Sequence, residues 1–69
     1  RERHELAELP ARIEALEAEQ AAIHARLGDP ALYREAGDEV GALTARDESL
    51  QAELAGLYAR WEDLEARST

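Results

Sequence analysis

The sequence predicts an all-α fold in which two long helices pair as an intramolecular antiparallel coiled-coil hairpin, with a short helix at its tip. Two apolar runs, spaced alternately by three and four residues, carry this prediction. The first run is Leu6, Leu9, Ile13, Leu16, Gln20, Ile23 and Leu27, and the second is Val40, Leu43, Asp47, Leu50, Leu54, Leu57, Trp61 and Leu64. Such spacing puts one stripe along each helix, and two stripes bury each other. The residues between the runs include Gly28, Asp29, Pro30 and Gly37, which favour turns and caps.

Composition agrees with one small helical domain over residues 1–69, whose core is thin at this size. Fifteen alanines, twelve glutamates and eight arginines favour long helices. The absence of cysteine excludes disulfides and thiolate metal sites. The chain starts at Arg1 without Met, so we expect an excised piece of a longer protein. It carries neither a long apolar run nor a signal peptide, and a cytoplasmic location without membrane contact is the expectation.

The first helix is predicted over residues 2–27. Pro10 falls inside it, and proline lacks the amide proton that would bond the carbonyl of Leu6. Two outcomes are open: the helix kinks at Pro10 and continues, or the main helix starts there. The apolar repeat extends back through Leu6, which favours the continuation.

The tip is predicted over residues 28–38. Gly28 suits a left-handed end of the first helix. Asp29 followed by Pro30 is typical of an N-cap and first helical position, so a short helix is expected over 30–36, ended by Gly37.

The second long helix is predicted over residues 39–67, with Asp38 as its cap. Glu39 in the first turn and Arg67 in the last suit the helix dipole. Gly41 and Gly56 each weaken this helix by ~1 kcal/mol relative to alanine.

Charge selects between two registers of the hairpin. Along one margin the first helix carries Glu5, Arg12, Glu19 and Arg26, and the second carries Glu39, Arg46, Glu53 and Arg60. If Leu6 faces Leu64, the neighbours across this margin repel. If Leu6 faces Leu57, all four pairs attract, and they are Glu5–Arg60, Arg12–Glu53, Glu19–Arg46 and Arg26–Glu39. Single exposed pairs contribute little, but four attractions against three repulsions decide the register, so we predict the second one.

Three residues on the seam are predicted to be structural. Gln20 and Asp47 interrupt the apolar stripes in adjacent layers, where they could share a hydrogen bond and fix the register. Trp61 is predicted to serve core packing or domain docking, and with Leu64 it is expected to reach past the N-terminus. Tyr58 is expected to flank the seam.

Nothing in the chain predicts catalysis or a cofactor. No phosphate-binding loop of the Walker type can form without lysine. His4 and His24 have no partner at metal-ligand spacing, so both are expected to be solvated surface residues. We therefore predict no catalytic, cofactor-binding or metal-binding residue.

Three stretches of the sequence resemble the C-terminal domain of Uup-type ABC-F ATPases. They are residues 5–17 (ELAELPARIEALE), 27–33 (LGDPALY) and 58–65 (YARWEDLE). The resemblance implies a hairpin at the C-terminal end of a cytosolic protein with two ATP-binding cassettes. ATP would be held by upstream domains, and the appended domain is linked in that family to binding DNA, while relatives act on ribosomes.

Two functions follow, and both stay open. The first is binding of DNA or ribosomal RNA, with Arg34 beside Tyr33 as the best contact and Arg26 and Arg46 near the same end. The net charge of −8 opposes such binding. Pairing in the predicted register also leaves only four arginines uncommitted: Arg1, Arg3, Arg34 and Arg67.

The second function is a protein-interaction or spacing arm that docks on its own ATPase domains, a ribosomal protein or another copy. It predicts that Leu32, Tyr33 and Trp61 matter for partner contact while salt has little effect. A monomeric hairpin is favoured, and a domain-swapped or four-helix dimer is the alternative.

Overall fold

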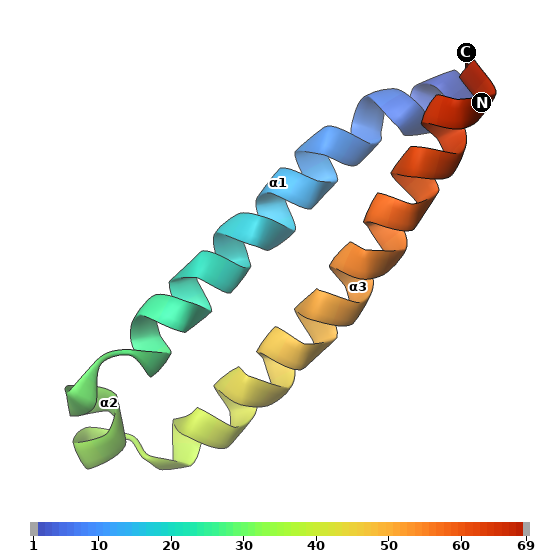
Figure 1. Cartoon of the computed structure of the whole chain (residues 1–69). Helices are drawn as coiled ribbons and strands as arrows, with labels where there is room; N and C mark the ends of the chain where they lie inside the picture. Colours follow the sequence, from blue (N-terminus) through green and yellow to red (C-terminus); the bar gives the residue numbers. More distant parts are fainter. Residues whose placement is uncertain (1, 69) are drawn as a thin grey trace.

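The computed structural model describes residues 2–68 as three helices, α1 (Glu2–Leu27), α2 (Pro30–Glu35) and α3 (Asp38–Ser68). No strand occurs in that range. The long helices α1 and α3 run antiparallel, and the short helix α2 closes the far end, so both termini lie at the same end (Figure 1). The molecule measures 52 × 15 × 15 Å. The predicted hairpin and all three predicted helices are confirmed, with bounds within one residue.

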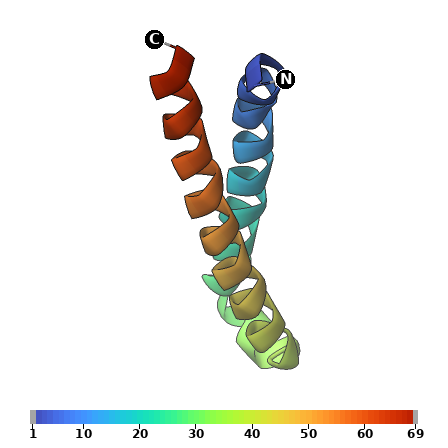
Figure 2. The ribbon, with the colours of Figure 1, turned by 90° about the vertical axis from the view of Figure 1, so that its right-hand side faces the viewer.

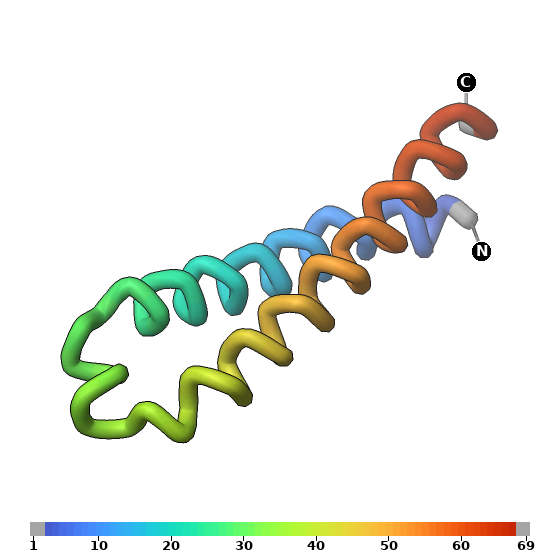
Figure 3. Tube along the Cα trace, turned by 60° about the horizontal axis from the view of Figure 1, so that its bottom comes forward, coloured from blue at the N-terminus to red at the C-terminus, as the bar shows by residue number. Residues whose placement is uncertain are grey.

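The two long helices wind about each other instead of lying flat. They run side by side in Figure 1, overlap near the tip after a quarter turn in Figure 2, and cross toward the termini in Figure 3. This winding keeps the apolar stripes of α1 and α3 facing each other over many turns, as a repeat of about 3.5 residues requires.

Pro10 lies within α1, and the helix continues through it. Of the two outcomes considered at Pro10, continuation of the helix is therefore confirmed over a start there. Because proline has no amide proton, the carbonyl of Leu6 loses its partner four residues on. Pro10 itself is exposed, so its ring lies on the side of α1 away from the core.

The core is a narrow seam of aliphatic side chains between the long helices. Leu50, at 0 % exposed, is its centre. The other buried residues of the seam are Leu9, Ile13, Ile23, Leu54 and Leu64. Among the described side chains no polar or charged residue is buried, so Gln20 and Asp47 sit half-exposed at its edge.

All four predicted charge pairs form. Glu5 pairs with Arg60, Arg12 with Glu53 and Glu19 with Arg46, each at 2.6 Å, and Arg26 pairs with Glu39 at 2.7 Å. We call this row of four arginine–carboxylate pairs the charged margin.

The predicted register of the core is wrong. Tyr58 bonds Glu17, His24 bonds Asp47 and Leu64 is buried, so Leu6 lies level with Leu64 and not with Leu57. With Leu6 opposite Leu57, Tyr58 and Glu17 would be about 18 Å apart along the helix axes.

Expectations about single residues are wrong at Gly28, Asp47, Leu64 and, as described below, Arg67. Gly28 is not left-handed, since no glycine in the described range has positive φ. Its amide instead bonds the carbonyl of His24 at 3.0 Å, and the amide of Asp29 bonds that of Arg26 at 3.1 Å. The chain thus leaves α1 through a tightened right-handed turn, which delivers Asp29 directly into its extended cap conformation.

Asp47 does not hydrogen-bond Gln20. It accepts a bond from Gln51 Nε2 at 3.0 Å and lies 2.8 Å from His24 Nε2. One turn along a helix brings positions four apart together, which explains Gln51. His24, expected to be solvated, crosses from α1 to meet Asp47.

Leu64 does not project beyond the N-terminal end of the hairpin, because it is only 2 % exposed. Trp61 is half-buried beside it on α3. The seam therefore extends to the level where α1 begins.

Candidate nucleic-acid interface

The tip is held by a small set of local contacts. Asp29 caps α2 by accepting a hydrogen bond from the amide of Ala31 at 3.0 Å, and Pro30 fills the first helical position. Leu32 is buried, and its carbonyl accepts the amide of Ala36 at 2.8 Å. A Cβ at Gly37 would lie 3.2 Å from the carbonyl of Tyr33, a tight contact that favours glycine.

The hydroxyl of Tyr33 is hydrogen-bonded, while about half of the residue is exposed to solvent. Its hydroxyl donates to the carbonyl of Leu27, the last residue of α1. The residue is nevertheless 53 % exposed. A tethered ring that faces solvent offers a flat surface at little cost in side-chain entropy.

Arg34 follows Tyr33 on α2 and is exposed. Within residues 3–67, whose side chains are described, no carboxylate pairs with it. Its guanidinium is therefore available to an anion.

Arg26 and Arg46 are committed elsewhere. Arg26 binds Glu39, and Arg46 binds Glu19 through two hydrogen bonds of 2.6 and 2.9 Å. The hydrogen bond with Glu19 raises the pKa of Arg46 and lowers that of Glu19. The four residues predicted as a contact site thus divide into an available pair, Tyr33 and Arg34, and two arginines already neutralised.

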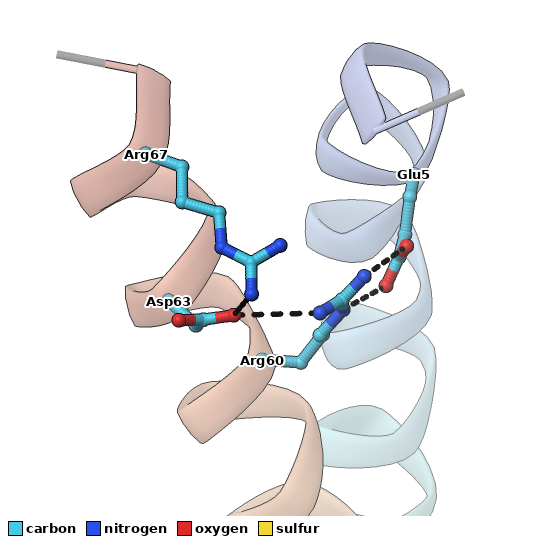
Figure 4. Close-up of polar contacts among 4 residues, drawn as sticks. All are labelled: Glu5, Arg60, Asp63 and Arg67. Carbon is cyan, nitrogen blue, oxygen red and sulfur yellow. Dashed lines mark hydrogen bonds and ion pairs between the residues drawn. The ribbon is translucent and has the colours of Figure 1, made fainter.

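Arginines at the opposite end of the hairpin are also engaged (Figure 4). Arg60 binds Glu5 through two hydrogen bonds of 2.6 and 3.0 Å and approaches Asp63 at 3.4 Å. Arg67 binds the same Asp63 at 3.1 Å. The hydrogen bond from Arg60 is the largest cause that lowers the pKa of Glu5.

Of the four arginines expected to be uncommitted, Arg67 is therefore paired, and Arg1 lies outside the described residues. Arg3 is exposed at the terminal end, and no described carboxylate pairs with it. The available cations on described side chains are thus Arg3 at one end and Arg34 at the other.

A second row of contacts lies on the other side of the seam. The hydroxyl of Tyr58 donates to Glu17, and this bond is the largest cause that raises the pKa of Tyr58. His24 and Gln51 bind Asp47 in the same row. We call these contacts the polar margin. The register with Leu6 opposite Leu57 could not have predicted it, because that register places Glu17 level with Arg46 and far from Tyr58.

No group of side chains in the described part of the chain is suited to hold a metal ion. His4 pairs with Glu8 at 3.1 Å, one turn along α1. The hollow near Pro10 is lined by Glu5, Glu8, Leu9, Arg12 and Leu57 among others. Its charged residues are already paired, Glu5 and Arg12 in the charged margin and Glu8 with His4.

The family model described as the ABC transporter C-terminal domain matches residues 1–66. The chain belongs to this family. It is thus an accessory C-terminal domain of an ABC protein, all-helical and without a catalytic domain. A search of curated proteins gave no match. A search of solved structures gave none either. In the range the structure describes, no helix of this ABC C-terminal domain is both long and apolar enough to cross a membrane.

Proposed function

We propose that this domain is the C-terminal appendage of a Uup-type ABC-F ATPase and that its tip contacts nucleic acid, either DNA or ribosomal RNA. Membership in the ABC C-terminal domain family supports the first part, together with the LGDPALY and YARWEDLE stretches. ATP would be bound by the cassettes of the parent protein, and the appendage would act beside them in the cytoplasm.

The observation that carries the proposal is the position of Arg34. It is an exposed cation at the tip without a described carboxylate partner, beside the half-exposed Tyr33. Phosphate contacts supply most non-specific affinity for nucleic acid. Because the arginines of the charged margin are neutralised, contact along the body of the hairpin is disfavoured and the proposal is confined to the tip.

A salt titration tests this function. Binding of the 69-residue chain to labelled DNA and RNA is measured at low and at physiological salt. We expect weak binding that strengthens as salt falls, and a loss of that binding in Arg34→Ala. Arg3→Ala is the matched control, since it removes another exposed arginine from the other end of the hairpin. No detectable binding at the lowest salt would refute the proposal.

A docking arm for a protein partner is the second candidate, and the net charge of −8 favours it. With the arginines of the margin paired, the outer faces present carboxylates such as Glu14 and Glu48. Such an arm would bind its own ATPase domains or a basic ribosomal protein. Arg34→Ala should then leave partner binding unchanged, while Tyr33→Ala or Trp61→Ala weakens it. Sedimentation would show whether the partner is a second copy.

A further inference from the structure

We propose that the tip recognises an unpaired nucleotide of a single strand, not a duplex, by stacking its base on Tyr33 while Arg34 holds a neighbouring phosphate. This inference rests on the proposed function and names the class of nucleic acid that fits the tip. Exposed aromatic rings bind single strands because every base has a π-face, and duplex bases are already stacked.

Tyr33 is suited to this role in a way that Tyr58 is not. The hydroxyl of Tyr33 binds a backbone carbonyl, which brings no charge to the ring. The hydroxyl of Tyr58 binds the carboxylate of Glu17, which would repel a phosphate. Tyr33 is also the more exposed of the two, at 53 % against 42 %.

The charge of the tip selects against a duplex. Arg34 is accompanied by Asp29, Glu35 and Asp38, while Arg26 is neutralised by Glu39. Duplex DNA carries one negative charge per about 1.7 Å of its axis, so a binding surface for it needs several free cations. A single strand has a lower charge density and can present one phosphate to one arginine. The tip offers one.

The rigidity of the tip completes the argument. The Asp29 cap, the buried Leu32 and the bond from Tyr33 to the end of α1 fix α2 against the hairpin. A base that stacks on Tyr33 therefore meets a preformed surface, which reduces the ordering cost of binding.

The test is an NMR titration of the isotope-labelled 69-residue chain at low salt. The probes are a single-stranded deoxythymidine octamer, the matching uridine octamer, and a DNA duplex of equal length. We expect both single strands to shift the signals of residues 29–37 comparably and the duplex to bind at least tenfold more weakly. The salt dependence should correspond to about one phosphate, a slope near −0.7 on logarithmic axes.

Variants separate stacking from charge. Tyr33→Leu should weaken single-strand binding about 5- to 150-fold, the range for one stacked base. Tyr33→Phe keeps the ring but loses the bond to Leu27, so it should bind more weakly than the parent and more tightly than Tyr33→Leu. Arg34→Ala should make the binding affinity less dependent on salt concentration. Tyr58→Phe at the distant aromatic should change nothing. Circular dichroism of every variant checks that the helices remain.

The outcomes distinguish the two proposals. Single-strand binding that depends on both Tyr33 and Arg34 supports the inference. Equal binding of duplex and single strand, or binding that ignores Tyr33→Leu but needs Arg34, overturns it and leaves the proposed function standing. A response to only one of the two single strands also overturns it, because sugar contacts would then carry the binding. No response to any probe refutes both.

Discussion

The two margins of the hairpin are built from different chemistry. The charged margin is a row of four arginine–carboxylate pairs, each joining a residue of α1 to a residue of opposite charge on α3. The polar margin has carboxylates too, those of Glu17 and Asp47, but tyrosine, glutamine and histidine bind them. The four charge pairs form even though Leu6 lies level with Leu64, so the charged margin alone does not fix the register of the core, and the bonds of the polar margin distinguish it.

Substitutions in the seam between the margins should have the largest effect on stability, because the seam sets the distance across which both rows of contacts form. Leu50→Ala should destabilise the fold by about 2–5 kcal/mol, since Leu50 is fully buried. Urea denaturation followed by circular dichroism measures this. Leu57→Ala, at a half-buried seam position, should cost less. Equal losses would show that the seam is packed evenly and that Leu50 is not its centre.

Helix propensity provides a reference that is independent of either margin. A Cβ at Gly41 or Gly56 would meet nothing within 4 Å. Gly41→Ala and Gly56→Ala should each stabilise α3 by ~1 kcal/mol, measured as a higher urea midpoint. Gly37→Ala should bring no such gain, because its Cβ would crowd the carbonyl of Tyr33. Unequal gains at Gly41 and Gly56 would mean that neighbouring side chains, not backbone propensity, govern these sites.

Double-mutant cycles compare the margins pair by pair. Arg12→Gln with Glu53→Gln should reveal a coupling of about 0.2–1 kcal/mol that fades in 1 M salt. Glu17→Gln with Tyr58→Phe should reveal a coupling that changes little with salt, because its donor is neutral. If both couplings responded alike to salt, the chemical distinction between the margins would have no energetic counterpart.

The smallest expected effects are those of pH on stability. The charged margin should lose stability in acid, and the polar margin should lose stability in alkali. The pKa values of Glu5 and Glu19 are lowered by their arginines from an ordinary 4.5. Their contribution to stability is present above pH 4.5 and is lost as pH falls through the lowered values. The pKa of Tyr58 is raised from 10.0, so its contribution is present below pH 10 and is lost as pH rises through the raised value.

Urea midpoints measured from pH 3 to pH 11 should therefore fall slightly in acid and again in strong alkali. Glu19→Gln should reduce the acid loss only, and Tyr58→Phe the alkaline loss only. A Tyr58→Phe variant that loses stability in alkali as steeply as the parent would contradict this assignment.

The difference between the margins also explains what could be predicted from the sequence. Spacing and charge sign depend only on position along a helix, so the helices, the hairpin and pairs such as Arg12–Glu53 were predictable. The bond between His24 and Asp47 was not, because it depends on which of several neutral partners a carboxylate selects once the helices are packed. The turn at Gly28 was missed because several backbone conformations can join two fixed helix ends.

The candidate site was predicted in part. Tyr33 and Arg34 could be named from their place in the tip, and the register already assigned Arg26 and Arg46 to pairs. The bond from Tyr33 to the carbonyl of Leu27 has no signal in the sequence, because it requires α2 to fold back over the end of α1. Whether these residues contact nucleic acid stays a prediction.

Both ends of the chain meet at one pole of a rod 52 Å long, and Tyr33 is carried on α2 at the other. If the rest of the protein were attached at that end, the hairpin would project from it as a rigid arm. A small rotation at the attached end would displace the tip over a much larger distance. Small movements of the attached domains would therefore decide where Tyr33 and Arg34 can reach.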